Sequence, residues 1–141
     1  MLVLGEDEFI ADWVCSQLPM VSSFGPCTAI GVVSQNRLIA GCVYSDYRKR
    51  FGTIEMSIAS ISPMWARKEN IAGLLRYPFE QLGVFKVYAA STLDNLKAIK
   101  ANKHIGFTKE AVLAHQFGQG NHAVIMRMLR PDYERLYGAA S

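Results

Sequence analysis

A change in the spacing of apolar residues halfway along the chain, from strand-like to helical, constrains the fold more than any other feature. Residues 27–61 hold three apolar, β-rich runs joined by turns at 34–36 and 48–52, which predict an antiparallel meander. Residues 69–83 then take helical spacing, and a short strand apolar on both faces follows at 84–91. A strand–helix–strand unit crosses over with a right hand, so the strands at 54–61 and 84–91 should be parallel. The sheet is therefore expected to be mixed.

The rest of the chain completes one domain over residues 1–141. Two interruptions are expected: Pro19 ends the first helix, and Pro78 kinks or restarts the helix at 69–82, which Gly83 ends. The remaining predicted elements are a helix at 6–18, a helix at 94–106 capped by Asp94 or Thr92 and closed by Gly106, strands at 107–117 and 122–129 around a turn, and a terminal helix from Pro131. The predicted class is α+β, in the order α-β-β-β-α-β-α-β-β-α.

Composition excludes several classes of protein. Half of the residues are hydrophobic and 19% are charged, as in an ordinary folded domain, and the net charge of +3 is compatible with an anionic ligand. No apolar run reaches about 18 residues, so no membrane span is expected. The three cysteines lack a paired spacing, the three histidines lack metal-ligand spacing, and the acidic start lacks a basic leader. We expect a cytoplasmic protein without a metal.

The stretch "ARKENIAGLL" at residues 66–75 indicates an anion site. It lies where the strand at 54–61 gives way to a helix, at the carboxyl end expected to be parallel to its neighbour. Free N–H groups at a helix start bind anions, and the small residues Ala72 and Gly73 allow a phosphate to approach the backbone.

Three segments resemble a known family. "RKENIA" resembles the Q/R-x-x-G-x-G/A loop of the GNAT N-acetyltransferases, with Arg67 and Ala72 matching and Asn70 standing where glycine is usual. Asparagine tolerates left-handed backbone, so the loop can still form. "NLKAIKANKHIGF" resembles the family's next helix and strand, and "GFTKEAVL" with "HAVIMRMLRPDYERL" resembles the tail of the Rim-type branch. The segments occur in the family's order within residues 27–137.

The resemblance implies a GNAT-like fold that binds acetyl-CoA. The pantetheine arm would pair with the strand at 56–61 and wedge between it and the strand at 84–91, while the pyrophosphate docks on the loop. Lys100, with Lys97, would reach the 3′-phosphate, but a plain solvated helix face is the favoured explanation of both lysines. The implied cofactor-binding residues are Ile58, Ala59, Ile61, Arg67, Lys68, Asn70, Ile71, Ala72, Gly73, Asn95 and Lys100. For Asn95 the alternative is a residue that supports the helix cap.

Catalytic roles also follow from the resemblance. Glu55 lies 12 residues before Arg67, close to the general base of the histone-modifying branch, and a carboxylate at a half-buried strand can take a proton from an ammonium. The alternative is an outward-facing strand glutamate. Backbone N–H groups near Ser57 would polarise the thioester oxygen. Asn102 replaces a tyrosine that protonates the leaving thiolate in many members.

The implied function is an acetyl-CoA-dependent N-acetyltransferase that acetylates a primary amine by direct attack in a ternary complex. The acceptor stays open: a protein N-terminus or lysine, a small amine, or a modified base. Two alternatives remain. One is a nucleic-acid-modifying relative of phage or prophage type, supported by the basic turn at 48–50; the other is a non-catalytic acyl-CoA-binding or interaction module, suggested by Asn70 and Asn102. An exposed sheet edge after residue 121 is expected to allow a homodimer.

Overall fold

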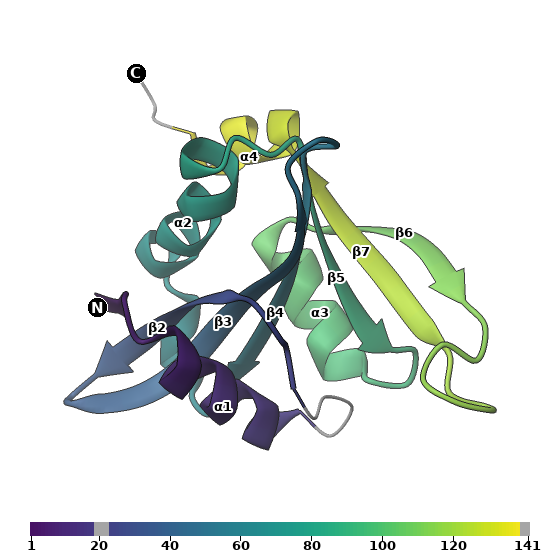
Figure 1. Ribbon diagram of the computed structural model, residues 1–141, viewed down its shortest axis with the longest axis horizontal. Coiled ribbons are helices and arrows are strands. Elements are labelled where there is room, and N and C mark those ends of the chain that lie inside the picture. The colour runs from purple at the N-terminus through teal and green to yellow at the C-terminus, as the bar shows by residue number, and fades with distance from the viewer. Residues whose placement is uncertain (19–22, 139–141) are drawn as a thin grey trace.

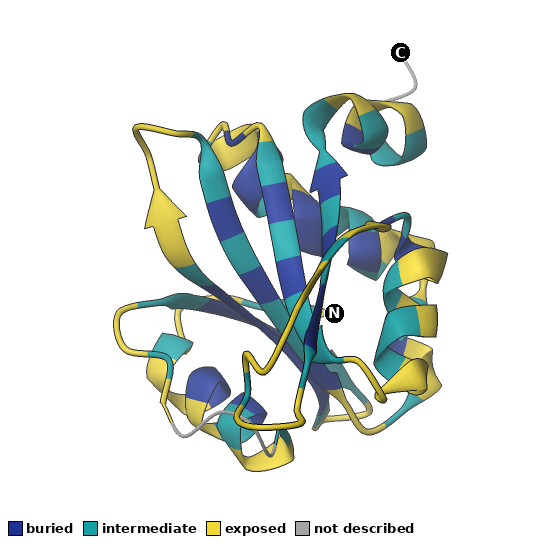
Figure 2. Cartoon of the chain, turned by 90° about the vertical axis from the view of Figure 1, so that its right-hand side faces the viewer, coloured by how far each residue is buried: buried dark blue, intermediate teal, exposed yellow. Residues whose placement is uncertain are grey.

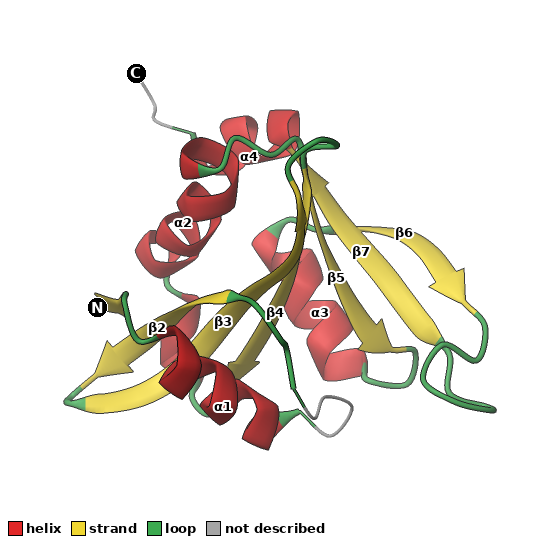
Figure 3. Ribbon diagram, viewed as in Figure 1, coloured by secondary structure: helices red, strands yellow, loops and turns green. Residues whose placement is uncertain are grey.

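The computed structural model describes residues 1–18 and 23–138, which form one mixed sheet with helices on both faces (Figures 1 and 3). The strands are β1 (Leu2–Val3), β2 (Thr28–Ser34), β3 (Arg37–Arg48), β4 (Thr53–Ser60), β5 (Lys86–Thr92), β6 (Thr108–Leu113) and β7 (Ala123–Leu129). The helices are α1 (Asp7–Gln17), the 3-10 helix η1 (Pro63–Ala66), α2 (Lys68–Arg76), the π-helical turn η2 (Tyr77–Gln81), α3 (Leu96–Ile105) and α4 (Arg130–Tyr137). The α+β class and the order of the expected elements are confirmed. The sequence did not reveal β1, because two residues carry no periodic signal.

The sheet has the order β1-β2-β3-β4-β5-β7-β6. The pair β4–β5 is parallel and the other neighbours are antiparallel, as the meander and the crossover predict. The expected free edge after residue 121 is wrong, because β7 lies between β5 and β6. The edge strand at that end of the sheet is β6, which is largely exposed (Figure 2).

The strands β4 and β5 pair over only part of their length. Their register runs through Thr53↔Lys86 and Ile54↔Val87 and ends at Glu55↔Tyr88. Beyond this pair β4 continues to Ser60 and β5 to Thr92, and the two strands diverge toward their carboxyl ends (Figure 1). The sheet therefore opens on the carboxyl side of Glu55 and Tyr88.

Helices cover the two faces of the sheet unequally. Alternate β4 residues such as Met56 pack into the main core with side chains from α2, α3 and α4. The opposite face, including Ala59, packs under α1 in a smaller core. The helix α1 comes very close to the sheet: a Cβ on Gly41 would lie 2.6 Å from Val14 Cγ2. A glycine at this β3 position allows that approach.

Most local signals act as expected. Acidic residues occupy the first turn of α1, which ends at Gln17; Pro19, the expected end of this helix, lies outside the described residues. Pro78 interrupts the second helix as a π-helical turn, since proline cannot donate the usual helical hydrogen bond, and the Leu82 N–H bonds instead to the Tyr77 C=O at 3.0 Å. Gly106, with φ of 120°, closes α3.

One expected cap is wrong. Asn95 caps α3, rather than Asp94 or Thr92, because its Oδ1 accepts the Ala98 N–H at 3.1 Å. The segment expected to be a strand at 107–117 ends as β6 at Leu113 and continues as a turn that contains His115 at φ of 56°.

Candidate functional site

The opening between β4 and β5 exposes backbone polar groups of β4. The Ile61 N–H donates to the Ile39 C=O at 2.9 Å, and the register with β3 is unbroken from Ser60 back to Glu55. Backbone groups alternate between the two sides of a strand. Odd-numbered residues of this stretch therefore face β3, and the N–H and C=O of Ile58, with the N–H of Ser60, face the opening. An extended ligand with amide groups can pair with this edge.

This alternation sorts the residues predicted on β4. Ile58 turns its backbone N–H and C=O to the opening, where the predicted pantetheine arm would lie. Ala59 and Ile61 turn their backbone groups toward β3, and Ala59 is buried under α1. The Ser57 N–H likewise faces Val43 of β3, so the predicted backbone donor near Ser57 is the N–H of Ile58. Ser60 is a candidate that the sequence analysis missed, because the strand's pairing partner decides which residues alternate outward.

The N-terminus of α2 lies just beyond the carboxyl end of β4. The Ile71 N–H donates to the Arg67 C=O at 3.0 Å and closes the first turn. Within the described chain, this leaves the N–H groups of Lys68, Glu69 and Asn70 without an intrahelical acceptor. Arg67, at the N-cap, has no side-chain cap bond. Three free N–H groups, the positive end of the helix dipole and two basic side chains thus lie together, an arrangement suited to an anion.

Two features of the loop have other causes than the sequence suggested. Asn70 lies inside α2, and its Nδ2 donates to the Trp65 C=O at 3.2 Å, so the left-handed backbone expected there is wrong. Gly73 packs against the missed strand β1, where a Cβ would lie 2.5 Å from Leu2 Cδ1, the flexible end of that side chain. Ile71 is buried in the core with its N–H already used, and Ala72 is half-buried in the following turn.

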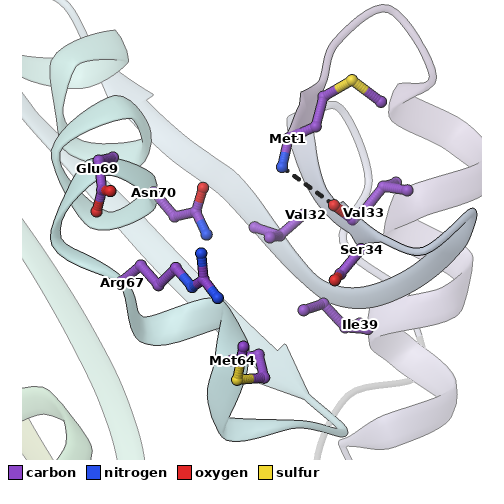
Figure 4. A pocket seen from close by; sticks show the side chains of 9 residues that line it. All are labelled: Met1, Val32, Val33, Ser34, Ile39, Met64, Arg67, Glu69 and Asn70. Atoms are coloured by element: carbon purple, nitrogen blue, oxygen red, sulfur yellow. Dashed lines mark hydrogen bonds between the residues drawn. The ribbon is translucent and has the colours of Figure 1, made fainter.

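Arg67 approaches the α2 N-terminus from the side of the β2–β3 hairpin. Its side chain points into a hollow of about 180 Å³ between α2 and the hairpin, where it lies beside Asn70 and faces Ser34 (Figure 4). The guanidinium therefore adds positive charge to this end of the helix without closing the β4–β5 opening.

The N-terminus of α3 lies at the carboxyl end of β5 and borders the same opening. Asn95 uses its side-chain oxygen for the cap, which supports the structural alternative for this residue and leaves its amide N–H groups for a ligand. Lys97 and Lys100 are both exposed on α3. Asn102 lies in α3 and carries a carboxamide, which has no acidic proton to supply.

Glu55 is half-buried at the point where the strands part. Burial raises its pKa above the usual value, and the negative charge of Asp46 raises it further. The register partner Tyr88 donates its hydroxyl proton to Asp46 at 2.6 Å. A carboxylate with a raised pKa in an opening is suited to general-base chemistry. The sequence analysis missed Asp46 and Tyr88, which carry no motif and meet only through the sheet.

The basic turn at 48–50 is partly engaged by neighbouring groups. The Arg48 Nε contacts Asp46 Oδ1 at 3.3 Å, and the Arg50 guanidinium lies 5.6 Å from the centre of the Phe51 ring. Two of the three cations proposed for nucleic-acid contact thus have partners within the chain.

Two further findings concern metals and membranes. Across residues 1–18 and 23–138, no three His, Cys, Asp or Glu side chains gather as metal ligands. None of the helices in these residues has the length and apolar character to cross a membrane.

Comparison with known proteins identifies the fold. No protein-family model and no curated protein matches the sequence. Solved structures of spermidine N-acetyltransferase SpeG from Vibrio cholerae do match. A point-mutant form has a TM-score of 0.77 at 19% identity, covering 94% of this chain and 95% of that chain, and a glutamate-substituted form has 0.75 at 18%, covering 96% and 97%. A dodecameric form has 0.65 at 23%, covering 77% and 68%. The chain therefore has the fold of the GNAT N-acetyltransferases.

Proposed function

We propose that this protein is an acetyl-CoA-dependent N-acetyltransferase that acetylates a primary amine by direct attack in a ternary complex. The observation that carries the proposal is the end of β4–β5 pairing at Glu55↔Tyr88. It leaves an open β4 edge, with the half-buried carboxylate of Glu55 at the point where the strands part. Two helix N-termini, of α2 and α3, border the same opening.

The described residues fit acetyl-CoA. The N–H and C=O of Ile58 match the alternating amides of a pantetheine arm, and the free N–H groups of Lys68, Glu69 and Asn70 match a pyrophosphate. Arg67 and Lys68 add positive charge there. Acetyl-CoA supplies a thioester whose acetyl group the acceptor amine can attack.

In the proposed reaction Glu55 accepts a proton from the acceptor ammonium, directly or through a water. The amine nitrogen then bonds to the acetyl carbon and the carbon–sulfur bond breaks. The nitrogen releases its second proton to solvent as the amide forms, and the departing thiolate takes a proton from solvent. The Ile58 N–H faces the opening and donates to the acetyl oxygen as negative charge develops on it. Asn102 cannot serve as the acid, so solvent takes that role.

The acceptor is proposed to be a polyamine or another small amine. The matching structures are named spermidine N-acetyltransferases, and the acidic pair Asp46 and Glu55 where the strands part suits a cation. Because a matching structure is a dodecamer, we also propose a homo-oligomer. The free thiols of Cys15, Cys27 and Cys42 suit the cytoplasm. Membership of the Rim-type branch and a phage origin remain hypotheses from the sequence resemblance.

The test measures thiol release from acetyl-CoA with a panel of amines: spermidine, 1,4-diaminobutane, an α-amino peptide and a lysine peptide. We expect release with at least one of these amines. Glu55→Gln should lose about 100-fold or more in kcat/KM while acetyl-CoA still binds. Binding without release by the wild type would favour a non-catalytic acyl-CoA module. An absence of acetyl-CoA binding would contradict the proposal.

A further inference from the structure

A bulge near the end of β3 turns an acidic side chain toward the proposed base. The β3–β4 register pairs Ser45 with Glu55 and then Arg48 with Thr53, so β3 holds one extra residue between these pairs. Asp46 lies in this bulge with φ of 53°, a left-handed conformation uncommon for residues other than glycine. Bulges re-aim side chains and are frequent beside active sites.

Three strands meet at this point. Asp46 comes from β3, Glu55 from β4 and Tyr88 from β5, and Glu55 and Tyr88 are the last register pair before the strands part. The Tyr88 hydroxyl donates to Asp46 Oδ2 at 2.6 Å. This bond between groups two strands apart holds the Asp46 carboxylate across the intervening strand, close enough for its charge to raise the pKa of Glu55.

The side chains of Asp46, Glu55 and Tyr88 affect one another's ionisation. The Tyr88 hydrogen bond is the main cause that lowers the pKa of Asp46, with Arg48 adding to the effect. Burial and the bond to Asp46 raise the pKa of Tyr88, so its hydroxyl keeps its proton and remains a donor. Asp46 therefore stays ionised and acts as a fixed negative charge on Glu55.

Of the three cations around Asp46, Glu55 and Tyr88, two are engaged by Glu110 and the third, Arg48, pairs with Asp46 itself. Arg48 meets Asp46 from the exposed side, so solvent screens that pair. Arg127 of β7 is the register partner of Tyr88, and its Nε lies 3.4 Å from Glu110 Oε1. Lys86 binds the other oxygen of Glu110 at 2.8 Å. Asp46 is thus the charge that acts most directly on Glu55.

We infer that Asp46 and Tyr88 are positioning residues for Glu55: the bulge and the Tyr88 hydroxyl hold the Asp46 carboxylate beside it, and the fixed negative charge makes Glu55 a stronger base. The inference rests on the proposed function, because Glu55 must act as a base for the effect to matter. It also predicts a preference for acceptors that arrive as cations, since a neutral acceptor gains nothing from the second carboxylate.

The experiment titrates the Glu55 carboxyl by ¹³C NMR in the resting protein, with the signal assigned by its loss in Glu55→Gln. The variants are Asp46→Asn, Tyr88→Phe and, as a matched control, Asp12→Asn on the exposed face of α1. Thermal unfolding checks that each variant folds. The same proteins are then assayed for kcat/KM between pH 5 and 9 with the amine that the wild type acetylates.

In Asp46→Asn the Glu55 midpoint should move down, because a neighbouring negative charge is lost. Tyr88→Phe should give a smaller shift in the same direction, and Asp12→Asn none. The acid limb of kcat/KM should follow each shift, and the plateau should fall about twofold or more as the base weakens.

An unmoved Glu55 midpoint in folded Asp46→Asn would overturn the inference, as would a midpoint shift without a matching shift of the acid limb. A wild type that acetylates no amine would instead refute the proposed function. The titration needs neither acetyl-CoA nor acceptor, so the two failures are distinguishable.

Discussion

The hydroxyl of Tyr44 donates to the carbonyl oxygen of Leu74 at 2.6 Å, in the core between β3 and α2. Tyr44 is only 2% exposed, so this bond ties the helix that carries the proposed phosphate site to the sheet. Removing one partner of a buried hydrogen bond leaves the other unsatisfied.

Tyr44→Phe should therefore lower the free energy of unfolding by about 1–2 kcal/mol, measured by urea denaturation. Tyr47→Phe is the matched control, since its hydroxyl lies on the surface 3.4 Å from the Leu82 C=O; this change should cost less than about 0.5 kcal/mol. Equal losses in both variants would show that the buried bond does not anchor α2.

Two glycine substitutions should separate packing from ligand binding. Gly41→Ala puts a Cβ 2.6 Å from Val14, whose branched side chain cannot easily turn away, and should cost about 1–3 kcal/mol of stability. Gly73→Ala meets only the flexible end of Leu2 on a short edge strand, while alanine favours the helix by about 1 kcal/mol.

Gly73→Ala should thus unfold at nearly the wild-type urea concentration and bind acetyl-CoA with unchanged affinity. A clear loss of affinity in this variant, with stability intact, would restore Gly73 to the phosphate site and contradict the packing explanation.

The N-terminus of α2 should respond to charge. Lys68→Glu places a negative charge beside the free N–H groups of the first turn, so acetyl-CoA affinity by calorimetry should fall by about tenfold. Arg67→Ala should reduce affinity less, because its side chain lies toward the hairpin (Figure 4). Lys103→Glu, in the last turn of α3, serves as the control and should leave affinity within about twofold. Equal losses of affinity in Lys68→Glu and Lys103→Glu would contradict a phosphate site at the N-terminus of α2.

Stability should depend on pH with opposite signs at the two acids. The folded-state pKa of Glu55 is above its ordinary 4.5, so between these two pKa values the folded protein binds more protons than the unfolded chain. The free energy of unfolding therefore falls as pH rises through this range. Glu55→Gln should therefore gain stability relative to wild type as pH increases from about 4.5, and then hold a constant difference.

For Asp46 the pKa is lowered from 3.8, so its contribution is present above 3.8 and is lost in acid. Asp46→Asn should be less stable than wild type at neutral pH and approach it in acid. Urea melts from pH 3 to 8 test both signs. A Glu55→Gln variant that loses stability relative to wild type as pH rises would contradict the direction assigned to Glu55.

The sequence predicted what depends on local pattern. Apolar periodicity and the crossover rule placed the parallel pair at 54–61 and 84–91, and positive-φ glycines such as Gly106 marked helix ends. The pattern could not reveal β1, which is too short to carry a period, and it chose the wrong cap for α3.

The site depended on information that no local stretch contains. Whether Ser57 or Ile58 turns its N–H to the opening is set by the register with β3, and a shift of one residue would exchange them. Asp46 and Tyr88 are 42 residues apart in the chain and meet only because of a bulge. The packing of Gly73 against Leu2 could not be foreseen either, because Leu2 lies in the strand that went undetected.

Amide NMR with acetyl-CoA tests the placement of the cosubstrate most directly. The amides of Ile58, Ser60 and Lys68 through Asn70 should shift and saturate together, while those of β6 stay in place. Shifts confined to the hollow around Ser34 and Ile39, or absent from β4 altogether, would contradict binding between β4 and β5.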